Sequence, residues 1–196
     1  MAALELIPLD RDILWIPNVI APEICRHVIT IINSQELTTA GILVDTVDTH
    51  IRSSDMLPLG GPHPLLQSTQ RLLMTCLHPV QQLLRQYYGI SFADMEAITL
   101  LRYRPGQFYR RHVDNILLAS RRLEVTQGIP TRDMGVVGYL NDDFSGGETY
   151  FDRQHVKVKP QQGAVVVFPA YYTHPHQALP VTRGEKYVFT TWLFHG

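Results

Sequence analysis

The second half of the sequence contains residues whose types and spacing could hold a metal ion. His112 and Asp114 are two residues apart, a His-Pro-His pair at His174 and His176 follows, and Lys186 lies ten residues after His176. Two imidazoles and one carboxylate are the ligands of mononuclear non-haem Fe(II) oxygenases, which leave the other iron positions open. Alternate side chains of a β-strand point to one side, so His112 and Asp114 can reach the same ion. The pattern predicts an iron site formed by these two residues and one histidine of the pair.

Three ordered segments surround these residues and make the prediction more specific than an isolated His-x-Asp pair, which occurs by chance in many proteins. They are YRPGQFYRRHVDN at 103–115, GYLNDDFSGGETYF at 138–151 and HQALPVTRGEK at 176–186, followed by Trp192. In this order they resemble the 2-oxoglutarate and Fe(II)-dependent dioxygenase superfamily, and specifically its prolyl 4-hydroxylase-like branch. The resemblance covers roughly residues 97 to 194, about half of the chain.

The resemblance implies a role for each residue of the site. The third iron ligand is His176 rather than His174, because the Pro-Val-x-x-Gly-x-Lys run of the family is in register with His176. Lys186 binds the distal carboxylate of 2-oxoglutarate with a compact, partly buried positive charge, and Arg183 is the next candidate for that role. Three further residues are implied to contact the cosubstrate: Tyr103, Tyr139 and Thr190.

The same resemblance implies the cofactors and the reaction. Fe(II) is the bound metal, 2-oxoglutarate and O2 are cosubstrates, and ascorbate serves as an accessory reductant. 2-Oxoglutarate is converted to succinate and CO2 while an unactivated C–H bond is hydroxylated. Related halogenases replace the carboxylate ligand by a small residue, whereas Asp114 is intact here, which favours hydroxylation.

Several substrate classes are compatible with this reaction. The first is a prolyl or other residue in a peptide or protein, and the alternative is a free amino acid or a specialised small-molecule metabolite. Nucleic-acid demethylation is disfavoured, because Trp192 and its neighbours occupy the strand on which such enzymes carry an extra arginine, and the net charge of -1 gives no basic surface. A cupin-like binding module without catalysis would have no need for Lys186.

The composition predicts a single soluble domain spanning residues 1–196. The chain has 45% hydrophobic and 18% charged residues, as in ordinary globular proteins, and no apolar run approaches the ~20 residues that span a bilayer. The first residues do not resemble a signal peptide, so a cytoplasmic location without membrane partners is expected. Cys25 and Cys76 are predicted to be unpaired apolar residues. The oligomeric state stays open.

The order of the elements predicts an α+β fold. Residues 1–96 are expected to be mainly helical support, with helices over Glu23–Ile32, after Pro22, and over Pro64–Tyr88, where Pro79 is expected to break or kink the helix. Residues 97–196 are expected to form the β core, which the resemblance narrows to a double-stranded β-helix of jelly-roll or cupin type with the helices packed on one sheet. The expected strands are Ala97–Tyr103, Tyr109–Val113, Gly135–Leu140, Glu148–Phe151, Val156–Val158, Ala164–Phe168, Gln177–Pro180 and Tyr187–Phe194.

The connection from Ile116 to Asp133 is long for a compact β fold and carries Arg121, Arg122 and Arg132. Long connections of this kind are commonly functional. We therefore predict a substrate lid that follows directly on the His112 and Asp114 segment.

Overall fold

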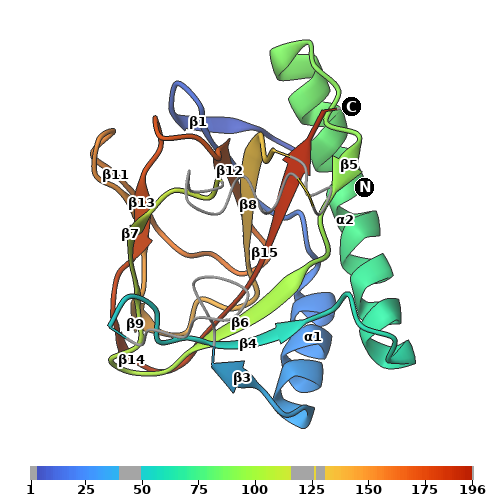
Figure 1. Ribbon diagram of the computed structural model, residues 1–196, viewed down its shortest axis with the longest axis vertical. Helices are drawn as coiled ribbons and strands as arrows, with labels where there is room; N and C mark the ends of the chain where they lie inside the picture. The colour runs from blue at the N-terminus through green and yellow to red at the C-terminus, as the bar shows by residue number, and fades with distance from the viewer. Residues whose placement is uncertain (1–3, 40–49, 116–125, 127–130, 196) are drawn as a thin grey trace.

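Two facing β-sheets form the centre of the computed structural model, which describes residues 4–39, 50–115, 126 and 131–195 (Figure 1). The main sheet has the strand order β1-β2-β12-β8-β15-β6-β4-β3, with β5 paired to β15. The minor sheet has the order β11-β10-β13-β7, and β9 and β14 form a separate pair. This arrangement confirms the α+β fold with a double-stranded β-helix core.

The strand bounds are as follows. The main sheet contains β1 Ile7–Asp10, β2 Ile13–Ile16, β3 Thr38–Thr39, β4 Asp55–Pro58, β5 Asp94–Met95, β6 Thr99–Tyr103, β8 Met134–Tyr139, β12 Val165–Pro169 and β15 Lys186–Phe194. The minor sheet contains β7 Tyr109–His112, β10 Thr149–Phe151, β11 Val156–Val158 and β13 His176–Ala178, and the separate pair is β9 Ser145–Gly146 with β14 Val181–Arg183.

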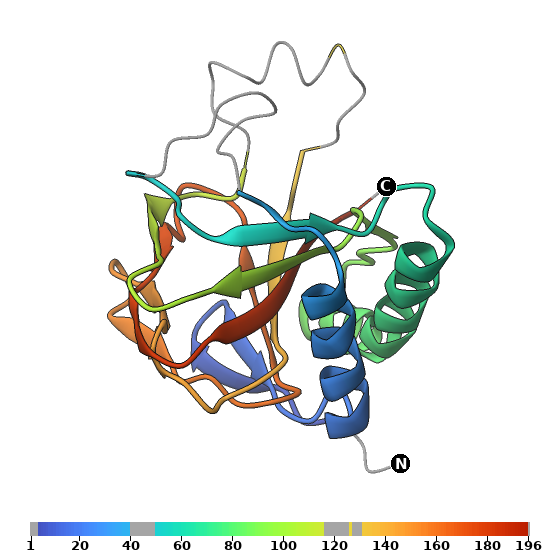
Figure 2. The same cartoon turned by 90° about the horizontal axis from the view of Figure 1, so that it is seen from below.

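Two helices cover one face of the main sheet, and the minor sheet lies on the other side (Figure 2). Helix α1 spans Pro22–Ser34 and helix α2 spans Pro64–Tyr88, and each begins with a proline in its first turn, where the missing N–H has no cost. Helix α2 is capped at its C-terminal end by Gly89, whose φ of 70° is left-handed. Pro79, where a break or kink was expected, is an exposed residue inside α2. The helix is not broken there but runs on to Tyr88.

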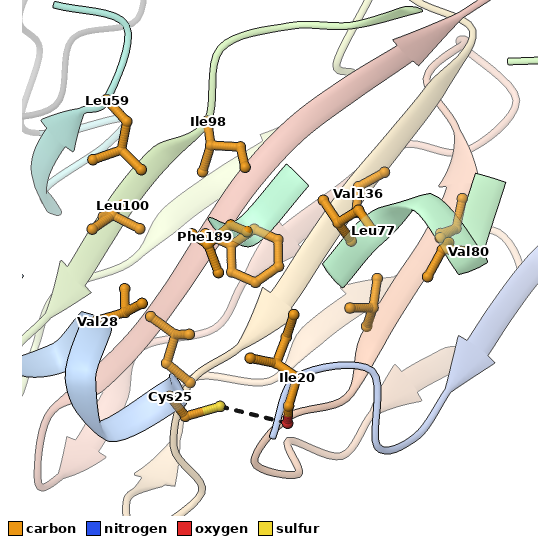
Figure 3. Close-up of a cluster of buried hydrophobic side chains, with 14 of the residues drawn as sticks. Ile20, Cys25, Val28, Leu59, Leu77, Val80, Ile98, Leu100, Val136 and Phe189 are labelled. Atoms are coloured by element: carbon orange, nitrogen blue, oxygen red, sulfur yellow. Dashed lines mark hydrogen bonds between the residues drawn. The ribbon is translucent and has the colours of Figure 1, made fainter. Parts of the chain in front are cut away.

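Alternation along β15 divides the core into two parts. Phe189 packs with residues from both helices, whereas its neighbour Val188 belongs to the cluster between the two sheets. Successive strand residues point to opposite faces, so one strand serves both cores. Figure 3 shows the helix-side cluster, in which Val28 of α1 and Leu77 of α2 lie near Phe189, and Cys25 contacts the carbonyl of Ile20.

The N-terminal half supplies the two expected helices and also five short strands that were not expected. Strands β1 to β5 all come from residues before 97 and pair within the main sheet. These strands are two to four residues long, too short for a clear alternating pattern. Cys25 and Cys76 are free, as predicted. No helix among the described residues is long and apolar enough to cross a membrane.

The predicted lid, Ile116 to Asp133, lies mostly outside the described residues. Of its arginines, only Arg132 is described.

Candidate active site

His112, Asp114 and His176 come together at the edge of the minor sheet. His112 ends β7 and pairs across the ladder with His176, the first residue of β13. Asp114 lies two residues beyond β7, not on it, and its Oδ1 atom is 3.4 Å from Nε2 of His112 and 3.6 Å from Nε2 of His176. Each residue offers one ligand atom, and these atoms lie within 4.8 Å of one another.

The orientation of both imidazoles leaves Nε2 available to an ion. Nδ1 of His112 lies 2.8 Å from the carbonyl oxygen of Arg110, and Nδ1 of His176 lies 3.2 Å from that of His174. A carbonyl only accepts, so each Nδ1 donates its proton and each Nε2 keeps a lone pair. The other histidine of the His-Pro-His pair thus supports His176 through its backbone.

Aromatic rings fix the planes of the two imidazoles. Tyr109 stacks on His112 with ring centroids 3.6 Å apart, and Phe168 meets His176 at 4.6 Å. The rings are therefore held in place before any ion binds.

The protonation states suit a metal ion. Burial lowers the pKa of His176 to about 4, although Asp114 opposes the shift, so the ring is neutral at physiological pH. Burial raises the pKa of Asp114, but the two histidines and a hydrogen bond from Trp192 outweigh it and hold this pKa well below its usual value. A neutral imidazole and an ionised carboxylate are the forms that bind metals.

Two features of the Asp114 environment were not anticipated from the sequence. A Cβ at Gly135 would lie 2.5 Å from Oδ2 of Asp114 and 2.7 Å from the Phe168 ring, so only glycine leaves room for the carboxylate. Trp192 pairs with Gly135 across β15 and β8 and hydrogen-bonds to Asp114. The sequence carried one signal for them, the position of Trp192 after the Lys186 segment.

Lys186 lies in the same cavity as the three candidate ligands, which has a volume of about 460 Å³. The lysine is 2% exposed, donates to the carbonyl of Gly147 at 2.6 Å, and lies 5.1 Å from the ring centre of Tyr103. Burial lowers its pKa to about 7, with Glu148 opposing the shift. Among the described residues no carboxylate lies at hydrogen-bond distance from this ammonium, and such a buried charge is suited to an anionic ligand.

The other predicted cosubstrate residues take two different positions. Tyr103 and Thr190 line the cavity, on the same face of the main sheet as Lys186. Tyr139 is fully buried and does not line the cavity. Its hydroxyl is 2.8 Å from Oγ1 of Thr149, and Thr149 is the residue that lines the cavity. Thr149 was not singled out from the sequence, although it lies within the 138–151 segment.

The donor set fits Fe(II). Imidazole nitrogens and carboxylate oxygens bind divalent metals of this kind at about 2.0 to 2.2 Å, so Oδ1 of Asp114, which lies 3.4 and 3.6 Å from the two Nε2 atoms, can share an ion with each histidine. An ion held by these two nitrogens and one oxygen would keep further positions for other ligands.

Comparison with known proteins points to the same chemistry. The model of the 2OG-Fe(II) oxygenase superfamily matches residues 98–194. The "Putative prolyl 4-hydroxylase" of Acanthamoeba polyphaga mimivirus is 29% identical over 185 residues, which are 90% of this chain and 71% of that protein. Prolyl 3-hydroxylase 1 of Homo sapiens is 36% identical over 90 residues, 42% of this chain but only 12% of that protein.

A solved structure extends the likeness to the fold. The prolyl hydroxylase of Trichoplax adhaerens, in complex with a hypoxia inducible factor oxygen degradation domain peptide fragment, superposes with a TM-score of 0.74 at 18% identity, covering 94% of this chain and 84% of that one. The fold, the matched segment and the His-Asp-His cluster beside a buried lysine agree, and the chain belongs to the 2OG-Fe(II) oxygenase superfamily, in its prolyl 4-hydroxylase-like branch.

Proposed function

We propose that this protein is an Fe(II)- and 2-oxoglutarate-dependent dioxygenase that hydroxylates a prolyl residue in a peptide or protein. The observation that carries the proposal is the position of His112, Asp114 and His176 in one cavity with the buried Lys186. The curated relatives are named prolyl hydroxylases, and the Trichoplax structure contains a bound peptide. These names support a prolyl substrate in a peptide.

Each residue then has a defined task. His112, Asp114 and His176 hold the iron, which when bound supplies the site of O2 activation. Lys186 neutralises the distal carboxylate of 2-oxoglutarate, and Thr190 offers a hydroxyl on the same strand. Val137 and Val188 contribute apolar surface to the cavity, which limits the access of water to the reacting groups.

The metal assignment is tested by titration of Fe(II) or Mn(II) under anaerobic conditions. His112→Ala and His176→Ala should each lose the site, whereas His78→Ala, an exposed histidine on α2, should bind as the wild type does. Undiminished binding in both cavity variants would overturn the assignment.

The reaction is tested by incubating the purified protein with Fe(II), 2-oxoglutarate and a panel of proline-containing peptides. We expect succinate to form in step with a mass gain of one oxygen on the peptide, and amino-acid analysis then separates 3-hydroxyproline from 4-hydroxyproline. Hydroxylation that also occurs in His112→Ala would remove the proposal.

A free amino acid or a small metabolite is the second candidate substrate. The cavity of about 460 Å³ is within the usual range of small-molecule sites, so it holds a compact substrate beside 2-oxoglutarate. Free L-proline and other amino acids therefore belong in the same assay. Coupled turnover of a free amino acid, with all peptides inert, would establish the second candidate instead.

A further inference from the structure

Arg132 and Glu96 form a two-pronged ion pair beside the site. Nε of Arg132 lies 2.6 Å from Oε1 of Glu96, and Nη2 lies 2.8 Å from Oε2, so the guanidinium and the carboxylate meet in parallel. The side chains are 24% and 21% exposed. Planar bidentate pairing of this kind fixes direction as well as distance.

Glu96 is itself held against the end of β15. Its backbone N–H donates to the carbonyl of Trp192 at 2.9 Å, and its carbonyl accepts from Oγ1 of Thr191 at 2.7 Å. The carboxylate of Glu96 is therefore a fixed support for Arg132, since the backbone that carries it is bonded on both sides.

The remaining contacts of Arg132 reach the candidate metal ligand from two directions. Nη1 donates to the backbone carbonyl of Asp114 at 3.0 Å, and the guanidinium carbon lies 3.5 Å above the ring centre of Trp192. Trp192 in turn hydrogen-bonds to the Asp114 carboxylate. Arg132 thus contacts the backbone of Asp114 directly and its side chain through Trp192.

We propose that Arg132, locked by Glu96, is a positioning residue that sets the direction of the Asp114 carboxylate and thereby the affinity of the site for its metal ion. The inference rests on the metal site of the proposed function and deepens it. Groups that orient metal ligands typically change metal affinity by about 10- to 100-fold when removed. The structure places Oδ2 of Asp114 against Gly135 and Oδ1 toward the two histidines, so a small rotation of the carboxylate would misdirect the ligand oxygen.

The chain offers a matched control in Arg102, an arginine of the main sheet. Arg102 binds Asp55 through Nε at 3.1 Å and Nη2 at 2.9 Å, with side chains 15% and 16% exposed. This pair joins β6 to β4, and neither of its two residues is among the described residues that line the cavity. Its removal reports the general cost of losing a partly buried arginine pair.

The test is titration of Co(II), whose visible absorption reports the number and geometry of its ligands, into wild type, Arg132→Met, Arg132→Lys and Arg102→Met. We expect Arg132→Met to weaken Co(II) binding about 10- to 100-fold and to alter the absorption bands. Arg132→Lys should not restore them, because lysine lacks the fork and the flat face. Arg102→Met should bind Co(II) with wild-type affinity and spectrum, even if its melting temperature falls as far as that of Arg132→Met.

A double-variant measurement strengthens the test. Glu96→Gln alone should weaken Co(II) binding in the same direction, and in the Arg132→Met background it should add little, since both changes break one connection. If Arg132→Met fails to fold, Glu96→Gln carries the test alone.

The outcomes separate this inference from the proposed function. Wild-type affinity and spectrum in Arg132→Met, or in Glu96→Gln where it alone is tested, would overturn the positioning role, as would an equal loss in Arg102→Met. A wild-type protein whose Co(II) binding is absent, or survives in His112→Ala, would overturn the metal site and the inference with it.

Discussion

Gly135 lies directly behind the Asp114 carboxylate, where a methyl group would meet Oδ2 at 2.5 Å and the Phe168 ring at 2.7 Å. The residue has no chemical group of its own, yet it determines where a candidate metal ligand can be. At this scale the sequence predicted the residues that carry functional groups but not those that make room for them. The residues with functional groups could be found from motifs in the sequence, whereas the residues that make room for them can be found only when it is known which strands are neighbours.

We expect Gly135→Ala to lose most of its metal affinity while remaining folded, because the added methyl displaces Asp114 or Phe168. Gly138→Ala is the control on the same strand: its methyl would overlap the Phe189 ring on the helix side, and such overpacking typically costs about 1 to 3 kcal/mol of stability. Metal titration and thermal unfolding of both variants check the contrast. Metal binding should survive in Gly138→Ala, and equal metal loss in both would contradict the explanation.

Lys186 is expected to determine 2-oxoglutarate affinity and not iron affinity. Removing one partner of a buried charge pair typically costs about 3 to 5 kcal/mol, so Lys186→Met should raise the dissociation constant of 2-oxoglutarate by roughly 100-fold or more. Lys157→Met, an exposed lysine 5.9 Å from the Tyr150 ring, is the control. Calorimetric titration measures the 2-oxoglutarate affinity of both variants. Unchanged affinity in Lys186→Met would mean that another residue binds the distal carboxylate, and Arg183 is the next candidate.

The pH dependence of Lys186 gives a separate prediction. Burial lowers its pKa from 10.5 to about 7, so above pH 7 the unfolded chain binds a proton that the folded protein has released. The contribution of Lys186 to the free energy of unfolding therefore rises with pH above about 7, whereas 2-oxoglutarate affinity falls because it needs the charged ammonium. The charged ammonium is the form that burial disfavours, so Lys186→Met should be more stable than wild type near pH 6, and this difference in the free energy of unfolding should narrow as the pH rises to 9. Urea unfolding of both proteins over this range checks the stability prediction. A constant difference would contradict it.

Strand β15 shows how one element serves the fold and the site at once. Lys186, Val188, Thr190 and Trp192 line the cavity, while Tyr187, Phe189 and Leu193 pack toward the helices. The eight strands expected from residue 97 onward all appear, with ends shifted by up to two residues, because turn residues bound their segments. The short pair β9 and β14 was not expected. Strands β1 to β5 were missed, and three of them, β2, β4 and β5, pair with strands from the second half of the chain, which their own residues do not indicate.

Adjacent substitutions in β15 should therefore have different effects. Phe189→Ala should lower the free energy of unfolding by about 3 to 5 kcal/mol and leave 2-oxoglutarate affinity nearly unchanged, with Phe189→Leu as a milder variant. Thr190→Val keeps the shape and removes the hydroxyl, so it should weaken 2-oxoglutarate binding by about 0.5 to 1.5 kcal/mol at little cost in stability. Urea unfolding and calorimetric titration together distinguish them, and reversed effects would mean that the strand register is wrong.

In the whole molecule, the candidate ligands are brought together by pairings between segments far apart in sequence. His112 and His176 meet across the β7 and β13 ladder, and Asp114 rests on β8 and β15. The resemblance to a known family predicted this meeting, whereas residue spacing alone left His174 and His176 as alternatives. The support for Asp114 by Arg132 was beyond prediction, because that arginine belongs to a connection that reads as loop.

Because the three candidate ligands are separated by up to 64 positions along the chain, ion binding should stabilise the entire fold. A ligand present at 100 times its dissociation constant adds about 2.7 kcal/mol. Thermal unfolding with Mn(II), with and without 2-oxoglutarate, should show stepwise increases in the melting temperature. In His112→Ala the increase with Mn(II) should disappear, and an increase that persists there would indicate binding elsewhere.

The candidate ligands and Lys186 are attached to opposite sheets: the histidines to the minor sheet, the lysine to the main one. Facing sheets lie about 10 Å apart, and apolar packing between them, such as Phe151 on Phe168 with ring centroids 4.8 Å apart, fixes that spacing. A cosubstrate that binds iron at one end and Lys186 at the other must bridge this gap. The distance between the two sheets therefore determines which length of 2-oxo acid can bind. A diacid one carbon shorter or longer than 2-oxoglutarate would fit one end and miss the other.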